Sequence, residues 1–277
     1  AAEKYSLVAE LYQLRDDKSR AALMLRQLAE LEPQELSHRR KLAALLLEAG
    51  LEVEARAELL QLADECLARG RDDESLDAYR QAIATAPESA QLYRRYGQAL
   101  VMLGRHEEAA EALGRAMQLD PTDIDVALAL TVELAVIGDW DAMEAVFAPL
   151  ATRASMDAGL LGDALSHYQK AVARLPENLD LRYCLGVLLR VDGRPEEARD
   201  HLEVSAAGEG RRPVFSHLYI GEDLLSAGDF VSASEHLRCG LEIIGAGRSG
   251  LSDGELPTVE TKYYRLLADA TAGSGDW

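Results

Sequence analysis

The sequence predicts an all-α protein, a solenoid in which about fifteen helices stack in pairs. Hydrophobic residues make up 48% of the 277 positions but aromatic residues only 5%, and the apolar content is mostly Ala and Leu. This composition favours packed helices over sheets, in which Val, Ile, Thr and aromatic residues dominate. Apolar residues recur at helical spacing, and glycines that end helices recur mostly at intervals of 34 or 35 residues. Together these observations predict a repeat built from helix pairs.

Residues 89–121 form the clearest predicted helix pair. In the first helix, four apolar or small residues share one face at the spacing i, i+3, i+4 and i+7: Tyr93, Tyr96, Gly97 and Leu100. Gly104 ends this helix, and Pro121 ends the second because proline cannot continue a helix. The inner face of the second helix is marked by Ala109, Leu113 and Ala116. We expect the small Gly97 to face the two alanines, so that the backbones approach closely.

This segment resembles the tetratricopeptide repeat, a helix–turn–helix unit of about 34 residues. The slots of that pattern are filled by Tyr93, Tyr96, Gly97, Leu100, Gly104, Ala109, Leu113, Ala116 and Pro121. The resemblance implies a right-handed α-solenoid of stacked repeats. It also implies that the first helices line a concave face, which holds a peptide or helix of a partner protein.

The chain is predicted to be a single array whose repeats have unequal lengths. Its parts are a repeat over 1–35, a three-helix unit over 36–87, a repeat over 88–121, a second three-helix unit over 122–176, repeats over 177–212 and 213–244, and a truncated repeat over 257–277. These boundaries follow from the glycines expected to end the first helices, which are Gly50, Gly70, Gly104, Gly138, Gly159, Gly193 and Gly228.

Two intervals between these glycines are too short for a full repeat. Four intervals are 34 or 35 residues long, but the first and the fourth are only 20 and 21, which leaves room for one helix. Helices 52–69 and 140–157 are therefore each expected to serve two neighbouring repeats. Since an extra helix interrupts pair-on-pair stacking, we expect irregular junctions with a kink or hinge near 70–90 and 158–178.

A Gly-Asp-aromatic motif occurs three times, at 138–140, 228–230 and 275–277. The first two copies fall at a turn between predicted helices, and the third falls at the end of the chain. Terminal repeats of a solenoid normally carry a polar capping helix. We therefore expect this chain to be a fragment of a longer protein.

Composition argues against nucleic acids and membranes as partners. The formal net charge is −19 and the pI is near 4.7, so phosphate backbones and anionic lipids would repel the chain. No apolar run approaches the length of a membrane span, and the N-terminus lacks the basic and apolar regions of a signal peptide. We expect no nucleic acid partner and no direct membrane insertion. A cytoplasmic location is favoured, or a periplasmic one if a signal peptide was removed.

The sequence gives no support for catalysis or for metal or cofactor binding. The three cysteines, Cys66, Cys184 and Cys239, are far apart, and the six histidines show no ligand spacing. Residues 245–250 match G-x-G-x-x-G, but a predicted helix precedes them where a dinucleotide site requires a strand. A flexible loop between helices is the better interpretation. The chain is predicted not to be an enzyme and to hold no cofactor or metal.

Candidate partner-binding residues are carried over from the repeat pattern as the exposed positions of first helices. In the N-terminal half they are basic or polar: Arg40, Lys41, Arg94, Arg95 and Gln98. In the middle and C-terminal half they are apolar or aromatic: Leu128, Val132, Tyr183, Val187 and Tyr219. The pair Arg94 and Arg95 either binds carboxylates of a partner bidentately or forms a solvated helix face. Leu128 and Val132 either belong to an exposed apolar patch or are buried by the neighbouring helix.

The resemblance predicts a non-catalytic scaffold that binds a partner peptide, helix or domain in the concave groove. Heavy use of Arg beside only five Lys hints at a bacterial gene, and by analogy at envelope assembly such as polysaccharide export, pilus assembly or motility. One alternative is a substrate-recruiting or regulatory arm of an enzyme whose catalytic domain is outside this chain. Another is a structural scaffold that self-associates through uncapped ends. The Lys/Asn/Arg set with which chaperone-binding relatives clamp a carboxylate is absent.

Overall fold

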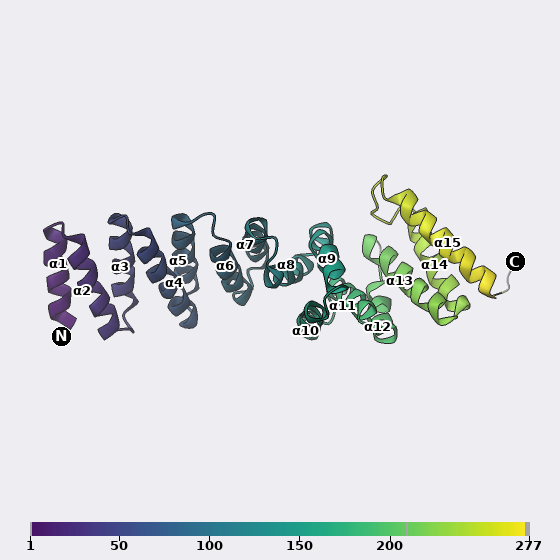
Figure 1. The fold of residues 1–277 in the computed structure, drawn as a ribbon, viewed down its shortest axis with the longest axis horizontal. Helices are drawn as coiled ribbons and strands as arrows, with labels where there is room; N and C mark the ends of the chain where they lie inside the picture. The colour runs from purple at the N-terminus through teal and green to yellow at the C-terminus, as the bar shows by residue number, and fades with distance from the viewer. Residues whose placement is uncertain (1, 209, 275–277) are drawn as a thin grey trace. The chain divides into compact units, whose positions relative to one another are not determined.

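The protein is built from helices alone. A computed structural model describes residues 2–208 and 210–274 (Figure 1). These ranges contain fifteen helices and no strand, which confirms the predicted fold class and number of helices. None of the helices within them is both long enough and apolar enough to cross a bilayer. The third Gly-Asp-aromatic motif, at 275–277, lies outside the described residues.

The chain divides into two compact units, Ala1–Val126 and Ala127–Trp277. The helices of the first unit are α1 (Ala2–Leu14), α2 (Lys18–Leu31), α3 (Leu36–Glu48), α4 (Glu52–Ala68), α5 (Asp72–Thr85), α6 (Ala90–Met102) and α7 (His106–Leu119). The boundary falls within α8 (Ile124–Ile137). The second unit continues with α9 (Trp140–Ala154), α10 (Ala158–Arg174), α11 (Leu179–Val191), α12 (Pro195–Ser205), α13 (Arg211–Ala227), α14 (Phe230–Gly245) and α15 (Leu256–Ser274).

In the first unit, α1 to α7 pack one against the next in chain order (Figure 1). Helix α4 therefore contacts both α3 and α5. The interior is filled by leucines that are at most 2% exposed, among them Leu42, Leu59, Leu76, Leu100 and Leu113. Leucine and alanine dominate this core, as their share of the composition leads one to expect.

Gly97 marks the closest approach between α6 and α7, and its nearest neighbour there is Leu113. A Cβ atom added at Gly97 would lie 2.7 Å from Cγ of Leu113. The three atoms nearest to that position all belong to Leu113, which lies between Ala109 and Ala116 among the buried residues of α7. Both alanines are buried, yet the glycine makes room for the larger leucine side chain.

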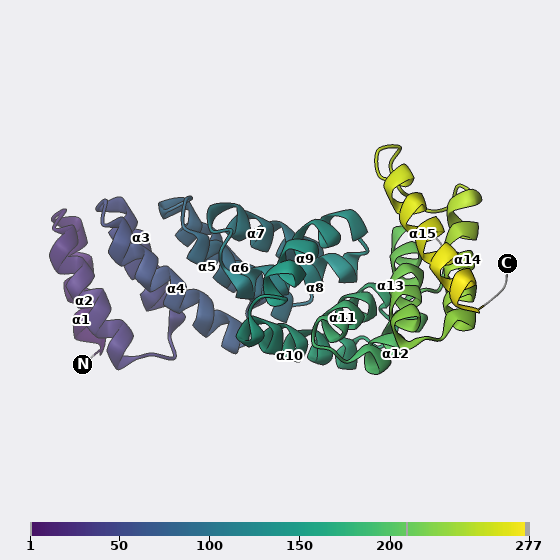
Figure 2. The same ribbon diagram turned by 45° about the vertical axis from the view of Figure 1, so that its right-hand side comes forward.

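In the second unit, α11 packs on four helices, which are α9, α10, α12 and α13. Helix α13 packs in turn on α14 and α15, and Figure 2 shows these three helices side by side. The core of this unit is richer in aromatic residues than that of the first. Its fully buried aromatic side chains are Phe147, Tyr168, Tyr183 and Tyr263.

Most of the glycines that were predicted to end first helices do so in the structure. Six of the seven predicted turn glycines have φ between 67° and 81°, the left-handed region that glycine adopts without strain. Gly159 is the exception, so the prediction that it ends a helix is wrong. It lies inside the first turn of α10, where the Asp157 side chain accepts hydrogen bonds from the amides of Gly159 and Leu160. An aspartate N-cap thus starts a helix at a point where we expected a glycine to end one.

Candidate functional site

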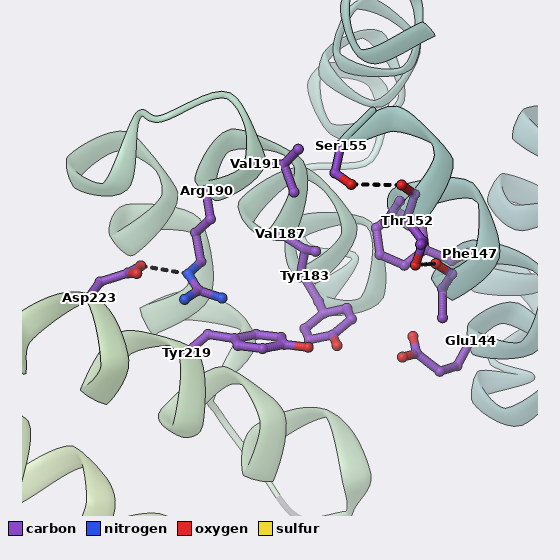
Figure 3. Close-up of a pocket in the computed structure, with 12 residues that line it drawn as sticks. Glu144, Phe147, Thr152, Ser155, Tyr183, Val187, Arg190, Val191, Tyr219 and Asp223 are labelled. Carbon is purple, nitrogen blue, oxygen red and sulfur yellow. Dashed lines mark hydrogen bonds and ion pairs between the residues drawn. The ribbon is translucent and has the colours of Figure 1, made fainter. Parts of the chain in front are cut away.

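A pocket of about 490 Å³ lies between α9, α11 and α13 in the second unit (Figure 3). We call it the α9–α11–α13 pocket. It brings together three of the predicted partner-binding residues, which are Tyr183, Val187 and Tyr219. Tyr183 is only 1% exposed and forms the base of the pocket, whereas Val187 and Tyr219 are half-buried along its wall.

Each of the three helices presents one face to the pocket. Helix α9 contributes residues at the i, i+3, i+4 and i+7 positions expected of a single face: Glu144, Phe147, Ala148 and Ala151, followed by Thr152 and Ser155. Helix α11 adds Arg190 and Val191 about two turns after Tyr183, and α13 adds Asp223 one turn after Tyr219. The pocket therefore has an apolar and aromatic wall with a few polar groups, the usual composition of a binding site.

Aromatic rings pack tightly at the base of this pocket. The rings of Tyr183 and Tyr219 are stacked with centroids 6.3 Å apart. Trp140 meets the edge of Tyr183 at 4.9 Å between centroids, and Phe147 does so at 6.3 Å. These contacts hold Tyr183 in one orientation, so the wall that an occupant would touch is pre-formed.

Arg190 is the one cation among the pocket's lining residues, and its charge is already offset. Its Nε donates a hydrogen bond to Asp223 at 2.7 Å, and its Nη2 donates one to Glu222 at 3.2 Å. The guanidinium also lies over the Tyr219 ring, 4.4 Å from the centroid. Figure 3 shows Arg190 directed toward Asp223 and away from Glu144.

Glu144 is the polar group of the pocket that stands without a hydrogen-bond partner. Its Oε2 atom is buried, and no donor within the described residues contacts that atom. Burial raises the pKa of the Glu144 carboxyl from 4.5 to about 7, although the positive charge of Arg211 acts in the opposite direction. Figure 3 shows this carboxyl on the side of the pocket toward which the Tyr183 and Tyr219 hydroxyls point. A buried carboxylate without a partner is costly unless a cation or a proton joins it.

The three predicted arginines of the first unit are paired with acids of neighbouring repeats. Arg94 contacts Asp123 and Asp125, each at 3.0 Å. Arg95 donates to Asp64 at 2.5 Å. Arg40 forms an ion pair with Glu74. These pairs join residues about one repeat apart in sequence, and they show that the arginines contribute to contacts between repeats. Neither reading of Arg94 and Arg95 in the sequence, solvated face or partner anchor, included this role.

The remaining predicted residues are placed separately. Lys41 lines another pocket, of about 480 Å³, between α1, α2 and α3. Gln98 is exposed on α6. Leu128 is buried at 4% exposure and Val132 is half-buried, so Leu128 belongs to the core rather than to an exposed patch. The structure thus brings together only Tyr183, Val187 and Tyr219 of the ten candidates in one pocket.

Sequence reasoning missed Glu144 and Phe147, which supply the α9 side of the pocket. Helix 140–157 was expected to be shared by two repeats, and no groove residue was assigned to it. One signal was available in the sequence. Glu144 lies between Met143 and Phe147, both of which are at most 1% exposed, and an acid within the apolar stripe of a helix often marks a special environment.

Comparison with known proteins identifies the repeat. The sequence profile of the tetratricopeptide repeat matches residues 60–124 and 150–211. The chain contains tetratricopeptide repeats. The second matched segment includes all of α11, the central helix of the pocket, whereas Glu144 and Tyr219 lie outside it. The pocket therefore combines a matched repeat with residues of α9 and α13 that the profile does not match.

Several solved tetratricopeptide repeat structures are similar to this chain at a low level. TTC0263, a thermophilic protein of Thermus thermophilus, is 19% identical, with 77% of this chain and 99% of that chain covered and a TM-score of 0.38. MamA from Desulfovibrio magneticus is 18% identical, with 70% of this chain and 97% of that chain covered and a TM-score of 0.34. A protein from Parabacteroides merdae is 14% identical, with 98% of both chains covered and a TM-score of 0.31. No curated protein matches the sequence.

Proposed function

We propose that this protein, with its tetratricopeptide repeats, is a non-catalytic scaffold that holds a peptide, helix or domain of a partner protein. Such repeats are generally protein–protein interaction modules, and their stacked first helices offer extended concave surfaces. The observation that carries the proposal is the α9–α11–α13 pocket. Three residues chosen from the repeat pattern as partner contacts line one hollow there, beside aromatic rings whose positions are fixed by packing.

A biological setting in bacterial envelope assembly, such as polysaccharide export, pilus assembly or motility, is part of this proposal. Its support is compositional, namely the low lysine content beside abundant arginine. The identity of the proteins captured in the experiment below tests this setting directly.

The test of the proposal is affinity capture from an extract of the source cells. Wild type is compared with Val187→Glu, which places a charge on the half-buried wall of the pocket. The matched control is Val231→Glu on α14, where the valine is 63% exposed and outside the pocket. Circular dichroism melting of all three proteins verifies that each is folded.

We expect one or a few proteins that wild type and Val231→Glu capture to be absent from the Val187→Glu eluate. If Val187→Glu captures the same proteins as wild type, the pocket is not the docking site. In that case the paired variant Arg40→Glu/Lys41→Glu tests the first unit, because Lys41 lines the other pocket. If a captured enzyme acts faster in the presence of this chain, the role of a recruiting arm is favoured.

Self-association is the second candidate function, and one specific observation favours it. Leu7, Leu11 and Leu14 lie at i, i+4 and i+7 on α1, and they are 60%, 47% and 84% exposed. An exposed apolar stripe of this kind is a common contact surface. If self-association is the function, the light-scattering mass of wild type rises with concentration, and Leu11→Glu abolishes the rise.

A further inference from the structure

The further inference concerns the chemistry of the group that enters the α9–α11–α13 pocket, and it rests on the proposed function. We propose that the pocket receives a lysine or arginine side chain of the partner segment, with the Glu144 carboxylate as its ion-pairing group. The argument depends on the charges that line the pocket, on the aromatic wall and on the unpartnered oxygen of Glu144.

The charges of the pocket favour a cation. Arg190 is bound by Asp223 and Glu222, and Glu222 also forms an ion pair with Lys262 at 2.6 Å, so these two anions and two cations balance. Glu144 has no such partner within the described residues. The local balance is therefore negative, in a chain whose formal net charge is −19. A basic segment would be attracted from a distance and would find in Glu144 a carboxylate that still needs a donor.

The walls of the pocket suit a long side chain that carries its charge at the tip. Phe147, Ala151 and Val187 offer an apolar surface, and the methylene groups of lysine or arginine pack on such surfaces while the charged head reaches a polar partner. The half-buried Tyr219 adds a hydroxyl oxygen that points toward the Glu144 side. The volume of about 490 Å³ lies in the usual range for pockets that bind small groups.

An acidic occupant is disfavoured by the same geometry. A partner carboxylate would have to displace Asp223 or Glu222 from Arg190, at hydrogen-bond distances of 2.7 and 3.2 Å. It would also meet Glu144 and Asp223 as like charges in a partly buried site, where repulsion is poorly screened. Arg190 therefore acts as a fixed part of the wall beneath the occupant.

Binding of a basic side chain is expected to depend on pH through Glu144. Burial holds the pKa of this carboxyl near 7 in the empty pocket. The groups that face it from the packed helices are Arg211 and Tyr219 on α13, Tyr183 and Cys184 on α11, and Tyr168 on α10. Burial raises the pKa of each of these tyrosines and of the cysteine, so all four remain neutral near pH 7. Only the ionised carboxylate attracts a cation, so affinity rises with pH.

The experiment uses a positional library of acetylated and amidated hexapeptides in which one position is fixed as each of the twenty residues in turn. Wild type, Glu144→Gln and Glu196→Gln are tested on the library at pH 6 and pH 8. Glu196 is exposed on α12, away from the pocket, so its variant matches the change in net charge. Melting curves confirm that all three proteins are folded.

We expect wild type and Glu196→Gln to enrich Lys and Arg at the fixed position, with an affinity about tenfold higher at pH 8 than at pH 6. Glu144→Gln should lose both the enrichment and the pH dependence. Enrichment of Asp or Glu, enrichment of apolar residues alone, or an absence of binding to the library would each overturn the inference.

The two proposals fail in distinguishable ways. If the captured protein depends on Val187 but the library shows no basic preference, the scaffold function stands and the lysine or arginine pocket is wrong. If capture is insensitive to Val187→Glu but peptides with Lys or Arg bind in a Glu144-dependent manner, the pocket is a basic-residue site without being the docking site of that protein.

Discussion

Gly97 on α6 lies directly against Leu113 on α7, so closely that a Cβ atom on the glycine would be 2.7 Å from the leucine Cγ. The same relationship recurs twice in the second unit. Gly186 meets Leu202 at 2.7 Å, and Gly221 meets Leu237 at 2.8 Å. In each pair the glycine of a first helix makes room for the leucine of the following helix. Both Leu113 and Gly97 are buried at this contact. The absence of a side chain on the glycine therefore allows the two helices of one repeat to approach closely.

Substitution of Gly97 by alanine should test this contact. The added methyl group would force Leu113 out of its position, and overpacking of a core typically costs about 1–3 kcal/mol. Urea denaturation should therefore show a lower midpoint for Gly97→Ala. The control is Gly114→Ala on α7, where nothing lies within 4 Å of the added Cβ, and the higher helix propensity of alanine should leave the midpoint unchanged or raised. Equal midpoints for Gly97→Ala and wild type would contradict the contact.

Tyr79 connects three helices of the first unit through one carboxylate. Its hydroxyl donates to Oδ1 of Asp64 at 2.5 Å, and Arg95 donates to Oδ2 of the same residue at 2.5 Å. We expect Tyr79→Phe to lower the free energy of unfolding by about 1–2 kcal/mol, because the hydrogen bond is to a charged group. Tyr96→Phe is the control, since its hydroxyl accepts one exposed hydrogen bond from Arg80. Thermal melting that does not distinguish the two variants would count against this network.

The general architecture was predictable because it depends on local patterns. Helical periodicity and turn glycines are properties of short segments, and six of seven glycines end helices in the left-handed conformation. Gly159 failed because an aspartate N-cap two residues earlier starts a helix there. A glycine near the start of a helix and a glycine after its end look alike in a sequence.

The side-chain contacts between repeats were not predicted, although a signal for them was present. Arg95 and Asp64 are 31 residues apart, and Arg190 and Asp223 are 33 apart. Residues about one repeat apart occupy equivalent positions on stacked helices, so opposite charges at this spacing can pair. The apolar stripe around Glu144 marks this position in the sequence, but the extent of its burial depends on how α9 packs against α11 beside α13.

Tyr263 secures α15 to α13 in the second unit. Its side chain is fully buried, and its hydroxyl donates to the backbone oxygen of Val214. Tyr263→Phe should leave that buried oxygen without its donor and cost about 1–3 kcal/mol. The adjacent Tyr264 is 60% exposed, so Tyr264→Phe should change stability by no more than about 0.5 kcal/mol. Hydrogen exchange of the α15 amides would report the loss locally, and faster exchange in both variants would refute the assignment.

Glu144 should make the stability of the protein depend on pH in an unusual direction. Its folded-state pKa, about 7, is raised above the value of 4.5 for an unperturbed glutamate. Between these two values the unfolded chain loses this proton while the folded protein keeps it. The contribution of Glu144 to stability is therefore fully present below about pH 4.5, declines as pH rises through 7 and is absent above that.

Comparison of wild type with Glu144→Gln across pH should reveal this effect, because glutamine stays neutral at every pH. We expect the two proteins to unfold at similar urea concentrations at pH 5, and Glu144→Gln to be more stable by about 1–3 kcal/mol at pH 8. Glu196→Gln, which changes an exposed acid, should follow wild type at both values. A basic peptide that binds beside Glu144 would stabilise the wild type at pH 8 and narrow its difference from the variant. A difference that is the same at pH 5 and pH 8 would mean that Glu144 ionises normally, and the expected rise of peptide affinity with pH would then be absent as well.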